Sequence, residues 1–252
     1  MGFVWLTKDI FKGLNVSAIG VDEGVQDTIG TKNSVNYLKT NMFHAYTYGG
    51  NLKFSNASSP FTALATAYFQ TGKNSAGSKM AGKLLAMKVD YKLIEALSVN
   101  IGTDYVSGDD KTTDGIQSNF KKLYGSEHNL YGLMDYWDAA LTQGLLDYYG
   151  GITGKIGKSL SVGGTYHIFN SEYAGKNKKG IAFGKDLGSE IDLTVNYKLN
   201  TWSTIQAGWS TYFTNHNTLI AKDMMNSATV VPVTRTPEWA YVMFIIKPAF
   251  LK

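Results

Sequence analysis

Cysteine is absent from the 252 residues, and proline occurs only 4 times. A chain without cysteine has no thiol chemistry, no cysteine-ligated zinc and no disulfide scaffold. The sequence also lacks any run of about 18 or more apolar residues, so it contains no segment suited to cross a membrane as a helix. Arginine is nearly absent, because Arg235 is the single arginine among 24 basic residues. A net charge of +4 falls far short of a nucleic-acid-binding surface, which excludes nucleic acid as a partner.

The residues that are abundant favour a β protein. Aromatic residues make up 13% of the chain, led by 16 tyrosines, and there are 27 glycines. Tyrosine and phenylalanine fit strands, and aromatic girdles are typical of barrels that sit in a membrane. A soluble β-sandwich or solvent-filled barrel can share this composition, so composition leaves both classes open.

Tight turns and long loops alternate along the chain. Short connections are predicted near 10–13, 55–59, 94–96, 156–158 and 200–201, and longer polar stretches at 24–36, 72–79, 108–142, 171–186 and 215–235. Short turns at one end and long loops at the other are the plan of a transmembrane β-barrel. We therefore expect an all-β, antiparallel, up-and-down barrel.

Between the turns, apolar and polar residues alternate with period two. Leu85, Met87, Val89 and Tyr91 share one face of a strand, while the other face carries the intervening residues 86, 88, 90 and 92. Membrane strands need about 9–11 residues, whereas strands of globular proteins usually have about 5–6. The strands predicted here are mostly of the longer kind, at 2–9, 13–23, 37–54, 60–71, 80–93, 96–107, 143–156, 158–170, 187–199, 201–214 and 236–249. This length favours the membrane barrel over the sandwich.

Eleven strands is an odd number, whereas bacterial single-chain barrels have even counts. One explanation is that residues 1–252 form a single barrel domain from which N-terminal strands are missing. The other explanation is a twelfth strand within 124–137. The start of the chain shows no basic region, apolar core or cleavage site of a signal peptide, so we expect either a processed chain or a fragment.

Several motifs resemble the alginate-export outer-membrane porins, in the version found in Bacteroidetes-type bacteria. They are Tyr-Val-Ser-Gly-Asp-Asp at 105–110, Leu-Tyr-Gly-Ser-Glu-His at 123–128 and Tyr-Gly-Leu-Met-Asp-Tyr-Trp at 131–137, with scattered shorter matches from about 40 to 250. The resemblance implies a large monomeric porin of about 16–18 strands in the outer membrane. The founding alginate exporter of this family is understood to pass a polyanion through a positive, arginine-rich constriction, from which this arginine-poor chain departs.

The strand pattern places charged and polar residues on the face predicted to line the lumen. These pore-lining candidates are Lys83, Lys88, Asp90, Asp104, Asp147, His167, Asp192, Lys198 and Gln206. Rings of charged side chains set the selectivity of a pore. Because lysines and aspartates are mixed here, the pattern argues against a strong preference for anions.

The longest loop, 108–142, is far longer than a turn requires and contains many apolar residues. We expect part of it to fold into the lumen as a gate or constriction; the alternative is an extracellular loop packed on its neighbours. The constriction candidates are Asp109, Asp110, Tyr124, His128, Asp135 and Trp137. If the loop folds inward, deleting 111–128 raises single-channel conductance.

Other chemistry has little support in the sequence. Asp109, Asp110 and Asp114 offer oxygen ligands for calcium, but their spacing does not fit an EF-hand loop, and we read them as solvated. His167 and Ser161 lie on one predicted strand face without a third orienting group, so we expect no enzyme. No cofactor and no metal site is predicted, since neither a phosphate-binding glycine loop nor a histidine metal motif occurs.

Together these features predict an outer-membrane channel for diffusion or export of a hydrophilic saccharide, with an anionic saccharide as one candidate. The expected partners are that solute and the outer-membrane lipid, with Lys176, Lys178 and Lys179 at a loop tip available to lipopolysaccharide. The alternative is a plugged structural or adhesive barrel that binds a partner through its long extracellular loops.

Overall fold

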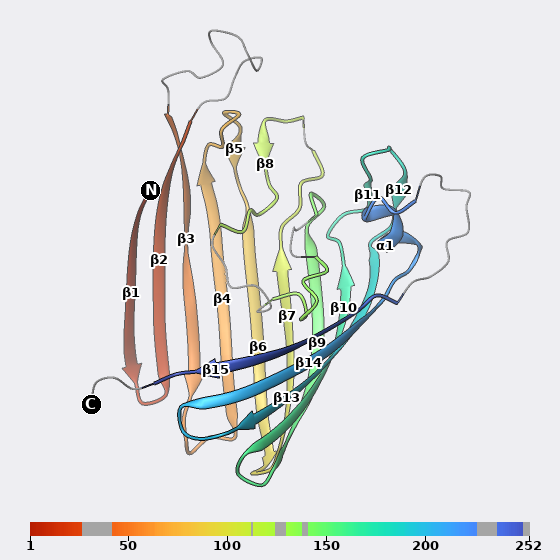
Figure 1. Cartoon of the computed structure of the whole chain (residues 1–252). Coiled ribbons are helices and arrows are strands. Elements are labelled where there is room, and N and C mark those ends of the chain that lie inside the picture. The colour runs from red at the N-terminus through yellow and green to blue at the C-terminus, as the bar shows by residue number, and fades with distance from the viewer. Residues whose placement is uncertain (27–41, 112, 124–129, 138–140, 226–235, 249–252) are drawn as a thin grey trace.

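One curved antiparallel sheet of 11 strands forms most of the protein (Figure 1). The computed structural model describes residues 1–252 except 27–41, 112, 124–129, 138–140, 226–235 and 249–252. Each strand of the sheet pairs with the next long strand along the chain, as in an up-and-down barrel. The strands are β1 (Gly2–Phe11), β2 (Leu14–Gln26), β3 (Met42–Ser55), β4 (Phe61–Gly72), β6 (Lys83–Ile94), β7 (Leu97–Val106), β9 (Leu145–Ile156), β10 (Leu160–Asn170), β13 (Asp186–Lys198), β14 (Ser203–Phe213) and β15 (Glu238–Ile246).

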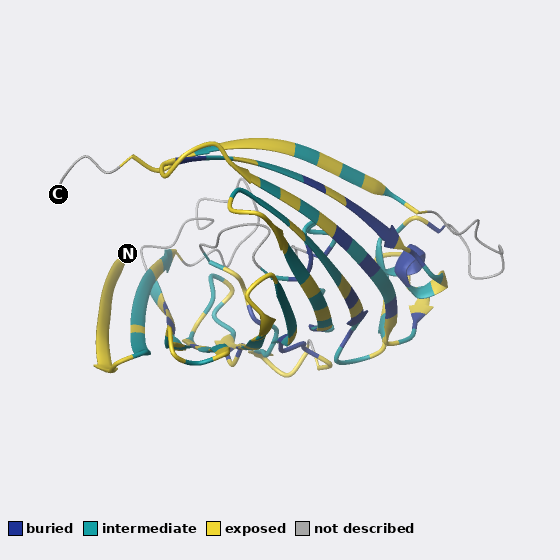
Figure 2. Ribbon diagram, turned by 90° about the horizontal axis from the view of Figure 1, so that it is seen from below, coloured by how far each residue is buried: buried dark blue, intermediate teal, exposed yellow. Residues whose placement is uncertain are grey.

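The sheet curves like part of a barrel wall, and its two edges are β1 and β15 (Figure 2). The described strands do not close the sheet, because β1 pairs only with β2 and β15 only with β14. The predicted number, order and antiparallel pairing of the eleven long strands are confirmed. The described part of the suggested twelfth strand, residues 130–137, contains no strand.

The two ends of the sheet differ, as the spacing of the turns predicts. At one end the chain reverses within a few residues, for example at Lys12 and Gly13, where Gly13 has φ +98°. Such a backbone angle suits glycine because it has no Cβ. At the other end lie the long connections, with two small strand pairs and one helix: β5 (Lys79–Met80) with β8 (Ile116–Gln117), β11 (Gly175–Lys176) with β12 (Ala182–Phe183), and α1 (His216–Ala221).

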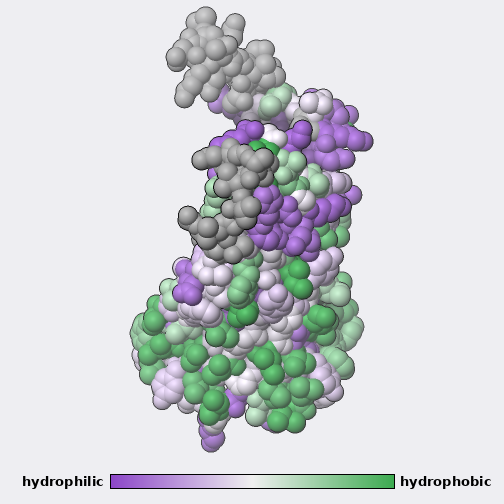
Figure 3. Space-filling view, turned by 90° about the vertical axis from the view of Figure 1, so that its right-hand side faces the viewer, coloured by the Kyte–Doolittle hydropathy of each residue, from purple (hydrophilic) through white to green (hydrophobic). Residues whose placement is uncertain are grey.

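Side chains alternate across the sheet in the way the sequence predicts. Along β7, Ile101 is 68% exposed on the convex face, while Asp104 and Val106 are buried on the concave face. Large apolar side chains cover the convex face of most strands, and Figure 3 shows them gathered toward the end with the short turns. Hydrophilic residues gather toward the end with the long loops (Figure 3). Within the described residues, no helix has the length and apolar character needed to cross a membrane.

The buried core lies on the concave side, near the loop end of the sheet. It combines residues of β6 to β14 with residues of the long connections, including Phe120, Trp137 and Leu219. Figure 2 shows buried positions concentrated on the later strands and α1. The core of this sheet is therefore built by loops that pack inside its curve.

Candidate functional site

Residues 130–137 of the longest loop, called here the infolded segment, lie against the concave face of β13 and β14. The backbone N–H of Leu133 donates to Oδ2 of Asp192 at 3.1 Å, and that of Met134 donates to Oε1 of Glu190 at 3.0 Å. Both carboxylates are buried on the concave face. Buried carboxyl oxygens need hydrogen-bond donors, so these two contacts fix the position of the segment inside the sheet.

Trp137 anchors the end of the infolded segment. Its side chain is fully buried, and its indole Nε1 donates to the Tyr212 hydroxyl at 2.8 Å. The hydroxyl of Tyr212 in turn donates to the backbone oxygen of Leu187. Tyr136 stacks on the Tyr212 ring with the centroids 4.2 Å apart. A buried tryptophan with a satisfied N–H contributes both area and direction, which holds the segment against β13 and β14.

Lys222, which follows α1, ties a second loop to the infolded segment. Its ammonium group lies 4.5 Å from the ring centroids of both Tyr136 and Trp137 and donates to the backbone oxygen of Tyr136. Cations are attracted to aromatic faces by the ring quadrupole. Burial raises the pKa of Tyr136, because the charged phenolate is disfavoured away from water.

An earlier part of the same loop is held by β4. Gln70 makes two hydrogen bonds with the backbone of Lys121, one in each direction, at 2.7 and 2.8 Å. Phe120 is buried beside this contact. The described parts of the loop are therefore attached to the concave face at two places, on β4 and on β13 with β14.

His167 of β10 lies between two aspartates from neighbouring strands. Its Nδ1 is 2.8 Å from Oδ2 of Asp147 on β9, and its Nε2 is 3.3 Å from Oδ2 of Asp192 on β13. An imidazole ring donates from both nitrogens only when it is protonated. The arrangement is thus a buried ion-pair triad. The imidazole ring of His167 stacks between the rings of Tyr149 and Phe169.

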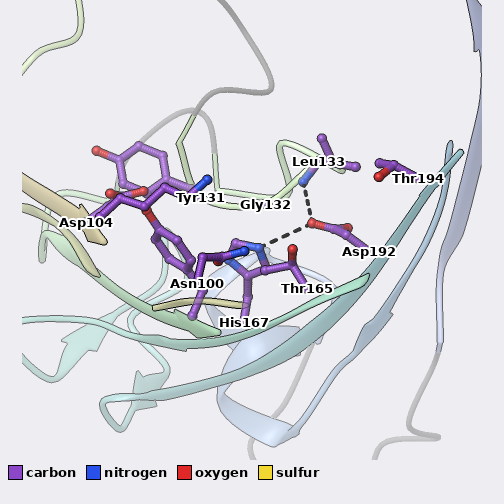
Figure 4. A pocket seen from close by; sticks show the side chains of 11 residues that line it. Asn100, Asp104, Tyr131, Gly132, Leu133, Thr165, His167, Asp192 and Thr194 are labelled. Carbon is purple, nitrogen blue, oxygen red and sulfur yellow. Dashed lines mark hydrogen bonds and ion pairs between the residues drawn. The ribbon is translucent and has the colours of Figure 1, made fainter. Parts of the chain in front are cut away.

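A cavity of about 230 Å³ opens between this triad and the infolded segment (Figure 4). In Figure 4, Asp104 and Asp192 lie on opposite sides of it, with His167, Asn100 and Thr165 between them. The infolded segment supplies one wall. The lining residues are Lys88, Asn100, Asp104, Tyr131, Gly132, Leu133, Tyr149, Thr165, His167, Asp192 and Thr194.

Four pore-lining candidates from the sequence meet at this cavity: Lys88, Asp104, His167 and Asp192. Asp147 lies directly behind His167, and Asp90 pairs with Lys88 at 3.3 Å. Gln206 lies elsewhere on the concave face and donates to Asn196 at 2.8 Å, while Lys198 lies at the short-turn end of β13 beside Lys158.

Lys83 lies on the opposite face from the one predicted. It is exposed, alternates with the buried Leu84 and pairs across the sheet with Phe69, which is exposed on the convex face. The reason is that side chains two residues apart in a strand point to the same face. Lys83 therefore shares the convex face with Leu85 and Met87. Its position close to the loop end accommodates a charged group on the convex face.

The constriction candidates divide in the same way. Trp137 lies in the infolded segment, as does Asp135, whose φ is +49°. Asp109 accepts a hydrogen bond from the backbone of Lys111 at 3.1 Å, and Asp110 is exposed; neither lines the cavity. Tyr124 and His128 lie outside the described residues. Across the described residues, histidine, aspartate and glutamate side chains form no group suited to hold a metal ion.

Sequence reasoning missed Glu190, Tyr149 and Tyr131. The alternation along β13 already places Glu190 on the same face as Asp192, so strand periodicity offered a signal for it. Tyr149 lies over Gly102 of the neighbouring strand, where any Cβ would collide with its ring. Tyr131 belongs to a loop, and no strand pattern places it.

Gly132 offers a test of how closely the infolded segment fits. Its φ is +81°, and a Cβ there would collide with the carboxylate of Glu190. We expect Gly132→Ala to lower the free energy of unfolding in urea by about 1–3 kcal/mol. The matched control is Gly115→Ala, since Gly115 has φ +77° but open space around it. Equal losses in the two variants would show that backbone strain alone, and not contact with Glu190, limits this position.

No protein-family profile and no curated protein matches the sequence. Among solved structures, an anion-selective porin from Comamonas acidovorans has a TM-score of 0.47 and 14% identity over 84% of this chain, and the chain spans 49% of that porin's length. The outer-membrane channel DcaP of Acinetobacter baumannii has a TM-score of 0.48 and 14% identity, covering 96% of this chain and 62% of the channel. The NanC porin has a TM-score of 0.44 and 9% identity, covering 98% of each chain.

Proposed function

We propose that this chain forms the wall and the constriction of an outer-membrane β-barrel pore for small hydrophilic solutes. The observation that carries the proposal is the two-sided sheet, with an apolar convex face and a polar, loop-filled concave face. Lipid favours the first face and water the second. The length of the strands supports this reading. For example, β2, β3 and β7 have 13, 14 and 10 residues, which is enough for tilted strands to cross a bilayer.

The cavity supports a solute rich in hydroxyl groups. Asn100, Thr165 and Thr194 offer amide and hydroxyl partners, and the Tyr149 ring offers an apolar face. A saccharide, the solute implied by the resemblance to alginate-export porins, has this mixture of surfaces. An anionic saccharide is less well supported, because the carboxylates of Asp104 and Asp192 line the same space.

The infolded segment also supports the alternative of a plugged, partner-binding barrel. Its contacts with Asp192, Glu190 and Tyr212 attach it firmly inside the sheet. A plug and a constriction share these contacts and differ only in whether ions still pass. The outer-membrane lipid and lipopolysaccharide are proposed partners in both cases, with Lys178 and Lys179 at an exposed loop.

Ion conductance in a planar lipid bilayer under a KCl gradient separates the two. Discrete openings are expected for the pore, and the reversal potential gives its ion preference. Asp147 and Asp90 lie next to His167 and Lys88, so with Asp104 and Asp192 the carboxyl groups at the cavity outnumber the cationic groups, and we expect a preference for cations. Inserted but silent protein would favour the plugged barrel, and protein that fails to insert would contradict both.

A lysine on the convex face tests insertion itself. Ile101 lies in the central part of β7 and is 68% exposed. In a bilayer, Ile101→Lys is expected to cost about 2–4 kcal/mol of folding free energy, because a charge near the midplane meets lipid. The control is Asn100→Lys on the adjacent concave position, where the ammonium group stays in water. Equal stability of the two variants in liposomes would rule out a lipid-facing convex surface.

A further inference from the structure

We propose that the cavity under the infolded segment binds the protonated amine of a small hydroxylated solute, as in an amino sugar. This binding site rests on the proposed function, because the cavity would bind the solute on its way through the pore. The cavity has a volume of about 230 Å³. Pockets for drug-sized ligands have volumes of about 300–1,000 Å³, so this cavity suits a smaller molecule.

The first argument is the balance of charge around the cavity. His167 contacts the carboxylates of Asp147 and Asp192, and Lys88 contacts Asp90. These pairs use the two cationic groups at the cavity. The carboxyl group of Asp104 also lines the cavity. Carboxyl groups therefore outnumber the cationic groups at the cavity, and a cationic ligand complements them.

The second argument is the state of Asp104. The residue is only 2% exposed, lines the cavity, and has a buried Oδ1 with no hydrogen-bond partner in the protein. Asp147, its neighbour across the β7–β9 pair, is fully buried and also carries a carboxyl group. A buried polar atom without a partner is costly, so the site favours a donor that reaches Asp104. An ammonium group brings three donors and a compensating charge.

The remaining lining groups indicate what is attached to the amine. Asn100, Thr165 and Thr194 come from three different strands and present polar groups to the cavity. The rings of Tyr131 and Tyr149 add aromatic surface, which attracts cations and packs on sugar rings. A bare metal ion is not the expected ligand, since the described acidic and histidine side chains form no metal-binding group.

Binding is tested by calorimetric titration of the refolded chain in detergent with three sugars of similar size. Glucosamine carries the protonated amine, N-acetylglucosamine lacks the charge, and glucuronate carries the opposite charge. We expect glucosamine to bind at least about tenfold more tightly than either of the others, the size of effect typical of a charge-assisted hydrogen bond. Equal binding of all three, or none by glucosamine, overturns the proposal.

A protein variant locates the site. Asp104→Asn keeps the shape of the side chain and removes its charge, so glucosamine affinity is expected to fall about tenfold or more. The matched control is Asp9→Asn, because Asp9 in β1 pairs with Asn15 and lies outside the cavity. Unchanged affinity in a folded Asp104→Asn variant overturns the site. If that variant does not fold, the comparison of the three sugars still decides.

Conductance distinguishes this proposal from the proposed function. Channels that conduct in KCl but are neither blocked by glucosamine nor bind it contradict the amine site alone. Protein that binds glucosamine but never conducts contradicts the pore and leaves the site standing. Conducting channels whose current falls when glucosamine is added, with no such effect in Asp104→Asn, support both.

Discussion

Replacing Trp137 with alanine is expected to raise the single-channel conductance and to destabilise the fold by about 3–5 kcal/mol. The indole is fully buried and donates to Tyr212, so the substitution leaves a cavity and removes a hydrogen bond. The Tyr136 ring and the Lys222 ammonium group both pack on the Trp137 indole, so the substitution also removes these two contacts. The infolded segment then keeps its backbone contacts with Asp192 and Glu190 and the stacking of Tyr136 on Tyr212, but it loses its fully buried anchor.

Two measurements on this variant separate stability from gating. Urea unfolding in detergent gives the loss of free energy, and bilayer recordings give the conductance. The control is Trp202→Ala, since Trp202 is 49% exposed in the turn between β13 and β14 and touches no part of the loop core. A Trp137→Ala protein that is destabilised but conducts like the wild type would show that the segment does not narrow the path of ions.

Removing the carboxylate of Asp192 is expected to have the second large effect. Asp192→Ala leaves the Leu133 N–H without its acceptor and His167 with Asp147 as its remaining carboxylate. Breaking a buried ion pair from one side costs about 3–5 kcal/mol, because the remaining charge stays buried and poorly compensated. Asp192→Asn is expected to lose less, since its amide oxygen still accepts from Leu133.

An exposed ion pair gives the comparison for Asp192. Lys88 and Asp90 lie 3.3 Å apart on the same face, but their side chains are 41% and 39% exposed. Asp90→Ala is therefore expected to cost only about 0–1 kcal/mol in urea unfolding. Similar losses for Asp192→Ala and Asp90→Ala would contradict a buried, coupled triad at His167.

The strands were predictable because each of them repeats one physical rule many times. Apolar and polar residues alternate over ten or more positions, and glycine or asparagine marks the turns, so the signal for β6, β7 and β13 is strong. Lys83 was assigned to the wrong face because its charge was taken to indicate the lumen, although the alternation places it with Leu85 and Met87. Near the loop end of the sheet a charged group can lie on the convex face.

The site was predictable only in its strand residues. Strand periodicity places four of the site residues on one face of the sheet: Lys88, Asp104, His167 and Asp192. It does not determine which residues of neighbouring strands lie beside them. The register of β9, β10 and β13 brings His167 between Asp147 and Asp192, and that register depends on the lengths of all the intervening strands and turns. No local pattern contains this information.

The sequence by itself determined the class of fold, the order of the strands and which face of most strands is polar, because these follow from residues close together in the chain. The tertiary structure decided where the longest loop goes. The position of Leu133 against Asp192 and of Trp137 against Tyr212 joins residues 59 and 75 positions apart in sequence. Such contacts form only when the curved sheet already presents its buried carboxylates and tyrosine, and they shape the cavity that we propose as the binding site.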